Sequence, residues 1–336
     1  MIRINNKTCF SLDDILGGFS LDMLRLYTYP LLREKLHHLR GCEEIANEVD
    51  GLVASKQNSS EFVQYTCLVK VFFHGDVSRG GEVLSSYMKS YLPVFLHDQQ
   101  DLVHVAGSTF KMGSMDSDAY DDEKTIHDVT LSDYYICQHT VTQQQWQKIN
   151  GNNPSYFKGD NLPVENVSWY DSVAYCNALS CHYGLKECYL INGTAVSLLN
   201  GGRGGFRLPT EAEWEFAACG GKKSRNFKYA GSDNLDEVAL YKDNSNSKTH
   251  PVCQKKSNEL GLYDMSGNVW EWCWDCYGSY PSLPQFNPLG ASSDSDCVCR
   301  GGSWNSLSDS CRVSYRNSNM PDNRGGDLGM RLVFAL

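Results

Sequence analysis

Cysteines in the C-terminal third of the chain stand at spacings that allow metal chemistry. Cys273 and Cys276 form a CxxC pair, and Cys297 and Cys299 form a CxC pair further along. Four thiolates would suit tetrahedral zinc if the loops that carry them converge. A CxC pair is a poor chelate for a single ion, so a disulfide among these thiols and free buried thiols are the alternatives. The spacing leaves all three interpretations open.

The charge and hydropathy of the chain restrict its partners. The 336 residues carry a net charge of −10, which disfavours a nucleic-acid partner because phosphate binding needs a basic face. No apolar run approaches the roughly 18 residues that a membrane-spanning helix requires. The N-terminus lacks the apolar segment of a signal peptide, which predicts a cytoplasmic protein. If a leader is missing from this chain, the expectation becomes the cell surface or export.

Two stretches of different character predict two domains. Residues 1–98 mix helical patterns with a strand-like segment at 62–73, and they predict a small mixed α/β domain of unknown role. Residues 99–336 open with an alternating, strand-like segment at 103–112 and an acidic run at 116–123 that is typical of a solvated loop. Helices and then a long, irregular, β-rich half follow, so the second domain is predicted to be α+β.

Helix-capping residues fix where the helices of the second domain begin. Thr142 precedes a short helix that ends at Gly151, and Ser168 precedes a longer one. Thr210 and Glu213 form a TxxE capping box, whose reciprocal hydrogen bonds set the start of a third helix. The second helix is expected to bury one face, formed by Trp169, Val173, Cys176 and Leu179.

An ordered set of short motifs runs through the second domain. It includes Phe110-x-Met112-Gly113, Pro163-Val164-Glu165-x-Val167-Ser168-Trp169, Arg207-Leu208-Pro209-Thr210-Glu211-Ala212-Glu213-Trp214-Glu215, the glycine- and tryptophan-rich segment 261–272, Arg300-Gly301-Gly302-Ser303-Trp304 and Gly329-x-Arg331-Leu332. With these motifs the domain resembles the formylglycine-generating enzyme, or sulfatase-modifying factor, family. The resemblance implies a variant of the C-type-lectin fold with little regular secondary structure.

The resemblance also locates the catalytic positions of the family. Its enzymes oxidise a substrate cysteine to formylglycine with copper(I) held by two cysteines, and the matching positions here are Ser306 and Cys311. A neutral hydroxyl is a hard, poor ligand for copper(I), so the pair is broken and bound copper is not expected. This argues against enzyme activity. The alternative function is an oxygen- and copper-dependent oxidoreductase of the formylglycine-generating type that acts on cysteine, with Cys311 as its reactive thiol.

A calcium site is the second implication of the resemblance. Members of the family bind calcium through a turn that matches Gly267, Asn268 and Val269, with an acid that matches Glu271. Such a turn offers several carbonyl oxygens beside one carboxylate, which suits a hard cation. The alternative is that Asn268 hydrogen-bonds within its own turn and that Glu271 pairs with an arginine such as Arg300.

The tail at 300–336 has a composition of its own. Arginines and glycines alternate there with small, mostly polar side chains. This pattern resembles the C-terminal variable region of proteins diversified by diversity-generating retroelements, which bind ligands through the varied side chains. Tyrosine offers rigid contact area, and Ser, Asn, Asp and Gly offer adaptable hydrogen bonds. An ordinary polar terminus is the alternative. The expected ligand contacts are Ser306, Leu307, Asp309, Ser310, Ser314, Tyr315, Asn317, Ser318, Asn319, Met320, Gly325, Gly326 and Asp327.

These patterns together predict a non-enzymatic, receptor-type protein. Its C-terminal surface is expected to bind a protein or other macromolecule. Arginines recur through the tail of this acidic chain, and we expect them to pair internally with Glu and Asp and so to fix the loops. They are Arg300, Arg312, Arg316, Arg324 and Arg331. Recognition of an anion is the alternative role.

Overall fold

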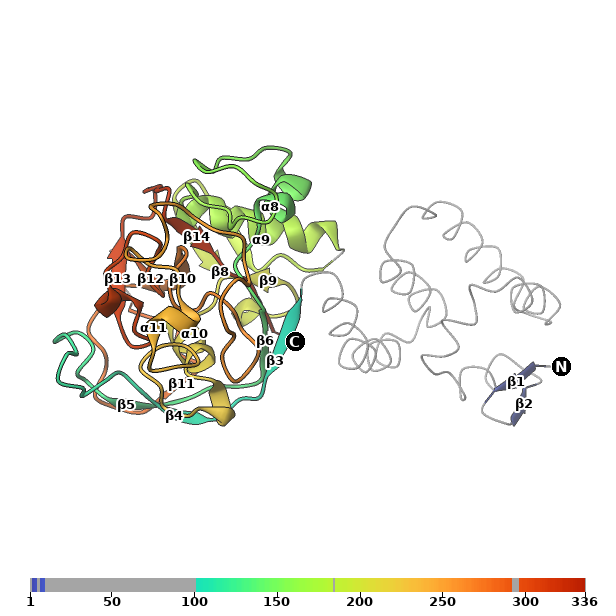
Figure 1. Cartoon of the computed structure of the whole chain (residues 1–336). Helices are drawn as coiled ribbons and strands as arrows, with labels where there is room; N and C mark the ends of the chain where they lie inside the picture. The colour runs from blue at the N-terminus through green and yellow to red at the C-terminus, as the bar shows by residue number, and fades with distance from the viewer. Residues whose placement is uncertain (1, 5–6, 10–100, 184, 292–295, 336) are drawn as a thin grey trace. The chain divides into compact units, whose positions relative to one another are not determined.

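A computed structural model describes residues 2–4, 7–9, 101–183, 185–291 and 296–335 of the chain (Figure 1). The chain divides into two units, Met1–Phe95 and Leu96–Leu336. In the first unit the described residues form an antiparallel hairpin of β1 (Ile2–Ile4) and β2 (Lys7–Cys9). The helices predicted within 1–98, the strand predicted at 62–73 and the predicted boundary at 98–99 lie outside the described residues.

Three helices of the second unit begin at the predicted caps. They are α8 (Gln143–Asn150), α9 (Trp169–His182) and α10 (Glu211–Ala218), and a complete capping box precedes each, at Thr142, Ser168 and Thr210. α8 ends at Gly151, whose φ of 73° is readily adopted by glycine. α9 buries the predicted face of Trp169, Val173, Cys176 and Leu179. Shorter helical turns are η1 (Asn200–Gly202), η2 (Gly221–Lys223), α11 (Leu235–Val238) and η3 (Ser308–Cys311).

Helix α10 is buried on every side. All eight of its residues are buried, and they include Trp214 and the three glutamates Glu211, Glu213 and Glu215. The helix lies against β4, β10 and β12. A carboxylate that leaves water must be paired or hydrogen-bonded. The position of α10 therefore sets where cationic side chains must enter the core.

Short strands form three sheets and a hairpin in the second unit, so the α+β class with little regular secondary structure is confirmed. The first sheet has the order β13 (Arg316–Asn319), β12 (Cys297–Arg300), β10 (Trp270–Cys276) and β14 (Leu328–Met330). The second has the order β11 (Gln285–Phe286), β5 (His127–Thr130) and β4 (Thr109–Met112). The third has the order β3 (Leu102–Val105), β6 (Tyr134–Cys137), β15 (Val333–Phe334) and β9 (Phe206–Arg207). The hairpin is β7 (Tyr189–Asn192) with β8 (Ala195–Leu198).

The single strand predicted at 103–112 is wrong. The segment forms two strands, β3 and β4, which belong to different sheets. Gly107 lies between them, and a Cβ there would come within 2.3 Å of the Leu131 carbonyl oxygen. The strand pattern is interrupted at 106–108, and position 107 needs glycine because only a residue without a side chain can approach the neighbouring backbone so closely.

The sheet around β10 positions the C-terminal tail. β10 is the strand of the glycine- and tryptophan-rich segment, and it pairs antiparallel with β12 and parallel with β14. β13 pairs with the far side of β12 and forms the edge of this sheet. Three of the four strands, β12, β13 and β14, therefore come from the end of the chain (red in Figure 1). β12 and β13 are neighbours on one side of β10, and β14 lies on its other side.

Candidate functional site

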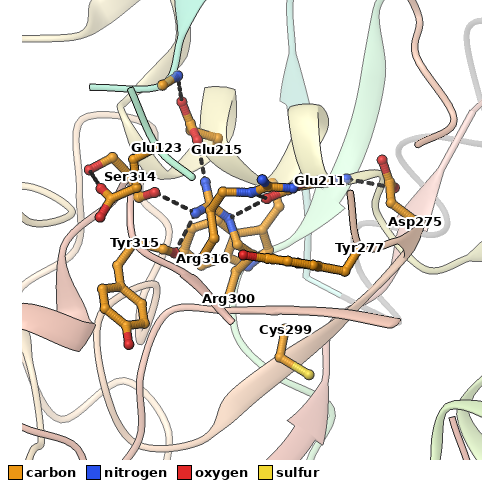
Figure 2. Close-up of polar contacts among 12 residues, drawn as sticks. Glu123, Glu211, Glu215, Asp275, Tyr277, Cys299, Arg300, Ser314, Tyr315 and Arg316 are labelled. Carbon is orange, nitrogen blue, oxygen red and sulfur yellow. Dashed lines mark hydrogen bonds and ion pairs between the residues drawn. The ribbon is translucent and has the colours of Figure 1, made fainter. Parts of the chain in front are cut away.

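The buried arginines of the tail point into the molecule. Arg312 donates to both carboxylate oxygens of Glu123 at 2.7 and 2.8 Å, and Arg316 donates to both oxygens of Glu211 at the same two distances. Arg331 donates to both oxygens of Glu271, and Arg300 donates to Glu215. Figure 2 shows Arg300 and Arg316 reaching toward α10, where Glu211 and Glu215 receive them. The exposed fractions are 0% for Arg300, 1% for Arg312, 5% for Arg316 and 0% for Arg331.

The prediction that the tail arginines pair internally is thereby confirmed. Which glutamate each arginine bonds could not be predicted from the sequence. Arg324 differs from the other four because it is exposed and bonds Asp171, which is itself half-buried. Burial alone would raise the pKa of Glu211, but the adjacent guanidinium groups of Arg316 and Arg300 bring that pKa below its ordinary value. The Glu211 carboxylate thus stays charged in the interior, where its two arginines balance it.

Several side chains between these arginines are exposed to solvent. Leu307 is 57% exposed and Met320 is 64% exposed. The ring of Tyr315 points away from the carboxylates in Figure 2. Most of the other predicted contact residues are partly exposed, namely Ser306, Asp309, Ser310, Asn317, Ser318, Asn319, Gly325, Gly326 and Asp327. That they contact a ligand stays a prediction.

Ser314 lies inside the arginine network. It is 8% exposed, its hydroxyl donates to Glu123 at 2.7 Å, and it accepts a hydrogen bond from Arg312 at 3.1 Å. A serine hydroxyl with both roles filled internally has little left to offer a ligand. Among the predicted contact residues, Ser314 is thus placed with the supporting arginines.

The outward surface continues from the tail onto an upstream loop. The Tyr120 ring meets the Tyr315 ring edge to face at 5.6 Å, and the Tyr120 hydroxyl donates to Asp309 at 3.0 Å. Tyr120 belongs to the acidic run at 116–123. Acids of that run pair with cations of the protein, Asp118 with Lys228 and Asp121 with Lys124. Most of the run is exposed, which agrees with the predicted solvated loop, and Tyr120 and Glu123 connect it to the tail through Asp309 and Arg312.

The two positions of the family's copper pair do not form a thiolate pair here. The Ser306 hydroxyl accepts a hydrogen bond from the Ser303 amide at 2.9 Å. Cys311 is 0% exposed and lies in an apolar cluster with Tyr229, Val238 and other residues. Burial raises the pKa of the Cys311 thiol to about 12, so the thiolate that a metal needs is disfavoured. These two residues do not fit copper(I).

The thiols of the CxxC and CxC pairs do not assemble a zinc site. Cys276 lies opposite Cys297 in the β10–β12 pairing, while Cys273 is buried in the main hydrophobic core. Within the described ranges, no group of three or more His, Cys, Asp or Glu side chains is placed to hold a metal ion. Cys273, Cys297 and Cys299 carry free thiols, which agrees with the third of the interpretations that the spacing left open.

The predicted calcium turn is occupied by internal contacts. Asn268 donates to the His250 carbonyl at 3.1 Å and accepts from the His250 amide at 3.2 Å. Glu271 is 0% exposed and receives Arg331 and the Trp214 indole N–H, the latter at 2.7 Å. A carboxylate that already holds a guanidinium and an indole does not fit calcium. The pairing of Glu271 with an arginine was foreseen, but its partner is Arg331 and not Arg300. Calcium binding by the carbonyls of 267–269 stays a prediction.

Two residues outside the predicted ligand contacts lie close to Gly326 of the tail. Tyr156 is 76% exposed and lies beside Gly326. Glu165 is 0% exposed, and its Oε2 has no hydrogen-bond partner among the described residues. Glu165 stands in the motif that begins at Pro163, but a motif does not reveal burial.

The helices that the structure describes include none with the length and apolar character of a membrane span.

Comparison with known proteins places this geometry in a family. Residues 93–336 match the model of the sulfatase-modifying factor enzyme 1-like domain. A chaperone protein LppX from Paenibacillus barcinonensis is 40% identical over 264 residues, which cover 69% of this chain and 89% of that protein. A formylglycine-generating enzyme from Streptomyces coelicolor is 32% identical over 210 residues, which cover 57% of this chain and 58% of the enzyme.

Solved structures agree with the sequence comparisons. The structure of Treponema denticola variable protein 1 superimposes with a TM-score of 0.65 at 38% identity, and the match covers 70% of this chain and 95% of that one. The predicted resemblance to a variable protein is confirmed by this match. From the family model and these relatives, the chain belongs to the sulfatase-modifying factor, or formylglycine-generating enzyme, family.

Proposed function

We propose that this protein is a non-enzymatic binding protein whose C-terminal surface contacts a protein or other macromolecule. The observation that carries the proposal is the arrangement along 300–331. Four buried arginines fix the backbone there, while side chains such as Leu307, Asn317 and Met320 are exposed or partly exposed. A rigid scaffold with exposed, adaptable side chains is what ligand recognition requires. The similarity to a variable protein supports the same function.

A library experiment tests this proposal. Leu307, Asn317, Ser318, Asn319 and Met320 are randomised together on the full chain, and the displayed library is selected against hen egg-white lysozyme as a probe. We expect most clones to fold and some to bind the probe with micromolar affinity or better.

A matched library sharpens the outcome. It randomises four buried positions of the same region, Val298, Val313, Leu328 and Met330. We expect most of its clones to be unfolded, because substitutions there disturb a close-packed core. The proposal is wrong if the two libraries unfold to the same extent, or if a well-folded outward library gives no binder.

The second candidate function is the copper-dependent oxidoreductase, favoured by the similarity to formylglycine-generating enzymes. Copper(I) titration and oxygen uptake with a cysteine-containing peptide test it. We expect no stoichiometric copper binding by the wild-type chain and measurable binding by Ser306→Cys, which would restore the second thiol. Turnover by the wild-type chain would reverse the ranking of the two functions.

Calcium forms a separate proposal. Carbonyl oxygens at 267–269 would hold the ion, and calcium would then raise the unfolding temperature relative to the chain in chelator. Equal unfolding temperatures with calcium and with chelator would show that the calcium proposal is wrong.

A further inference from the structure

Buried glutamates of the second unit follow one rule, and Glu165 breaks it. Five buried glutamates each bond an arginine: Glu123 with Arg312, Glu211 with Arg316, Glu213 with Arg207, Glu215 with Arg300 and Glu271 with Arg331. Glu165 is as deeply buried, and among the described residues no ion pair reaches it. Its Oε1 accepts from the Phe157 amide at 2.8 Å, while its Oε2 has no partner there. An unpaired buried carboxylate oxygen is costly, so its surroundings indicate what would complete it.

Gly326, one of the predicted contact residues of the tail, lies close to this oxygen. A Cβ added to Gly326 would lie 3.7 Å from Glu165 Oε2 and 3.5 Å from the Tyr156 Cβ, which are ordinary contacts. The φ angle of Gly326 is outside the left-handed region, so a residue with a side chain can adopt its backbone. A side chain at position 326 would therefore start between the Tyr156 ring and the unpaired oxygen.

Of the five glycines of the described tail, Gly326 is the only one with room for a Cβ. A Cβ at Gly302 would lie 2.7 Å from Cys311 Sγ, and one at Gly329 would lie 2.4 Å from the Val164 carbonyl oxygen. At Gly301 the nearest atom is a Trp214 ring carbon at 3.0 Å, and at Gly325 it is Asp327 Oδ1 at 2.8 Å. Gly301 and Gly302 also have positive φ angles of 95° and 75°. Only position 326 accepts a side chain without displacing a neighbour.

We propose that Glu165 is a fixed hydrogen-bond acceptor for a donor side chain at position 326, which makes residue 326 a specificity-determining position of the ligand surface. The inference rests on the proposed function, because it concerns how a varied residue of that surface is held. A serine or threonine hydroxyl extends one C–O bond beyond the Cβ, and a Cβ at 3.7 Å from Glu165 Oε2 puts that oxygen within reach of the hydroxyl. An asparagine amide or a basic side chain also offers N–H donors.

The charges around position 326 select among donors and acceptors. Glu165 and Asp327 are both carboxylates, and the cation that most affects Glu165 is Lys158, whose Nζ donates to the Asn153 carbonyl at 2.9 Å. Burial raises the pKa of Glu165, and the amides of Tyr156 and Phe157 counteract part of that effect. An acidic side chain at 326 would add a third carboxylate and be repelled. Position 326 thus favours Ser, Thr, Asn, Lys and Arg, and it rejects Asp and Glu.

The experiment compares Gly326→Ser with Gly326→Ala on the full chain. Both variants add a Cβ, but only serine adds a donor. We expect the unfolding equilibrium constant of the serine variant to be roughly fivefold smaller than that of the alanine variant. The carboxyl carbon of Glu165, followed by NMR, should titrate at lower pH in the serine variant, because a hydrogen bond to the charged form favours it.

A second pair tests the role of charge. Gly326→Asp should be less stable than Gly326→Asn at pH 7, and that difference should shrink in a Glu165→Gln background, where Phe157 keeps its acceptor. The inference is overturned if the serine and alanine variants share both stability and the pKa of Glu165. It is also overturned if Asp and Asn at 326 are equally stable, or if calcium chloride alone lowers the pKa of Glu165 in the wild-type chain, because the acceptor would then serve a cation.

Failure of this inference is distinguishable from failure of the proposed function. The NMR and stability readouts need no ligand, whereas the library selection needs no substitution at 326. In a library that also varies residue 326, folded clones should be depleted of Asp and Glu at 326 but not at Ser318, whichever probe protein is used.

Discussion

Residues 300–331 contain two sets of side chains that face opposite ways. Four of the five arginines enter the core and bond glutamates from α10, β10 and the loop at 116–123, while Leu307 and Met320 face solvent. The comparison teaches that fixed and adjustable positions can alternate within one short stretch of chain, because a long arginine side chain anchors the backbone from below. Three predictions test how strictly the two sets are separated, and a fourth tests the start of α10, the helix that receives two of the arginines.

The largest effect is expected from the buried set. Arg312→Ala would leave Glu123 buried without its guanidinium, and the free energy of unfolding should fall by about 3–5 kcal/mol. Arg324→Ala removes an arginine whose side chain is 50% exposed and should cost about 0–1 kcal/mol. Urea denaturation at pH 7 measures both. Equal losses would mean that the tail arginines do not differ in role.

The second-largest effect is expected from acid, which should weaken the buried pair of Glu123 and Arg312. Burial raises the pKa of Glu123, but hydrogen bonds from Arg312, the Tyr120 amide and Ser314 outweigh it and lower the pKa below the ordinary 4.5. A depressed carboxyl pKa stabilises the fold above the unfolded pKa, and this contribution is lost as the pH falls through the folded value. Between pH 5 and pH 3, wild-type stability should therefore decline more steeply than that of Glu123→Gln. Parallel declines would show that Glu123 does not contribute to the acid response.

A smaller effect is expected at the start of α10. Thr210→Ala removes the cap hydroxyl that accepts from the Glu213 amide and should cost about 1 kcal/mol. Thr140→Val is the matched control, because the Thr140 hydroxyl is buried without a described partner. Its replacement should be neutral or stabilising. If both substitutions cost the same in thermal unfolding, the capping account of α10 fails.

The smallest effect belongs to the outward set. Met320→Ala changes a residue that is 64% exposed and should shift stability by no more than about 0.5 kcal/mol. Met330→Ala makes the same chemical change at a residue that is 0% exposed and should cost about 2–5 kcal/mol. Similar values for the two methionines would show that the tail surface is part of the core after all.

Local signals in the sequence predicted local structure well. The caps Thr142, Ser168 and Thr210 fixed three helix starts because capping depends on residues only three positions apart. The segment at 103–112 was misjudged because the reason for its break, the approach of Gly107 to Leu131, involves a distant part of the chain. Periodicity carries no information about such an approach.

In the candidate site too, local features were predictable and long-range contacts were not. Charge composition indicated that the tail arginines pair internally, but the partner of each depends on how β12, β13 and β14 align with α10 and β10. That is why the sequence indicated an arginine for Glu271, with Arg300 as the example, but could not identify Arg331. Ser314 and Tyr315 are adjacent and both suited to ligand contact by type, yet one is inside the network and the other faces out. The unpaired oxygen of Glu165 had no sequence signal at all.

The place of β15 in its sheet has a consequence for synthesis of the protein. β15 lies between β6 and β9, so it fills an interior position that two much earlier strands must leave open. A chain growing on the ribosome holds β3, β6 and β9 well before residues 333 and 334 exist. Closure of this sheet must therefore follow translation of the tail, and every tail variant is made before the domain can complete its fold.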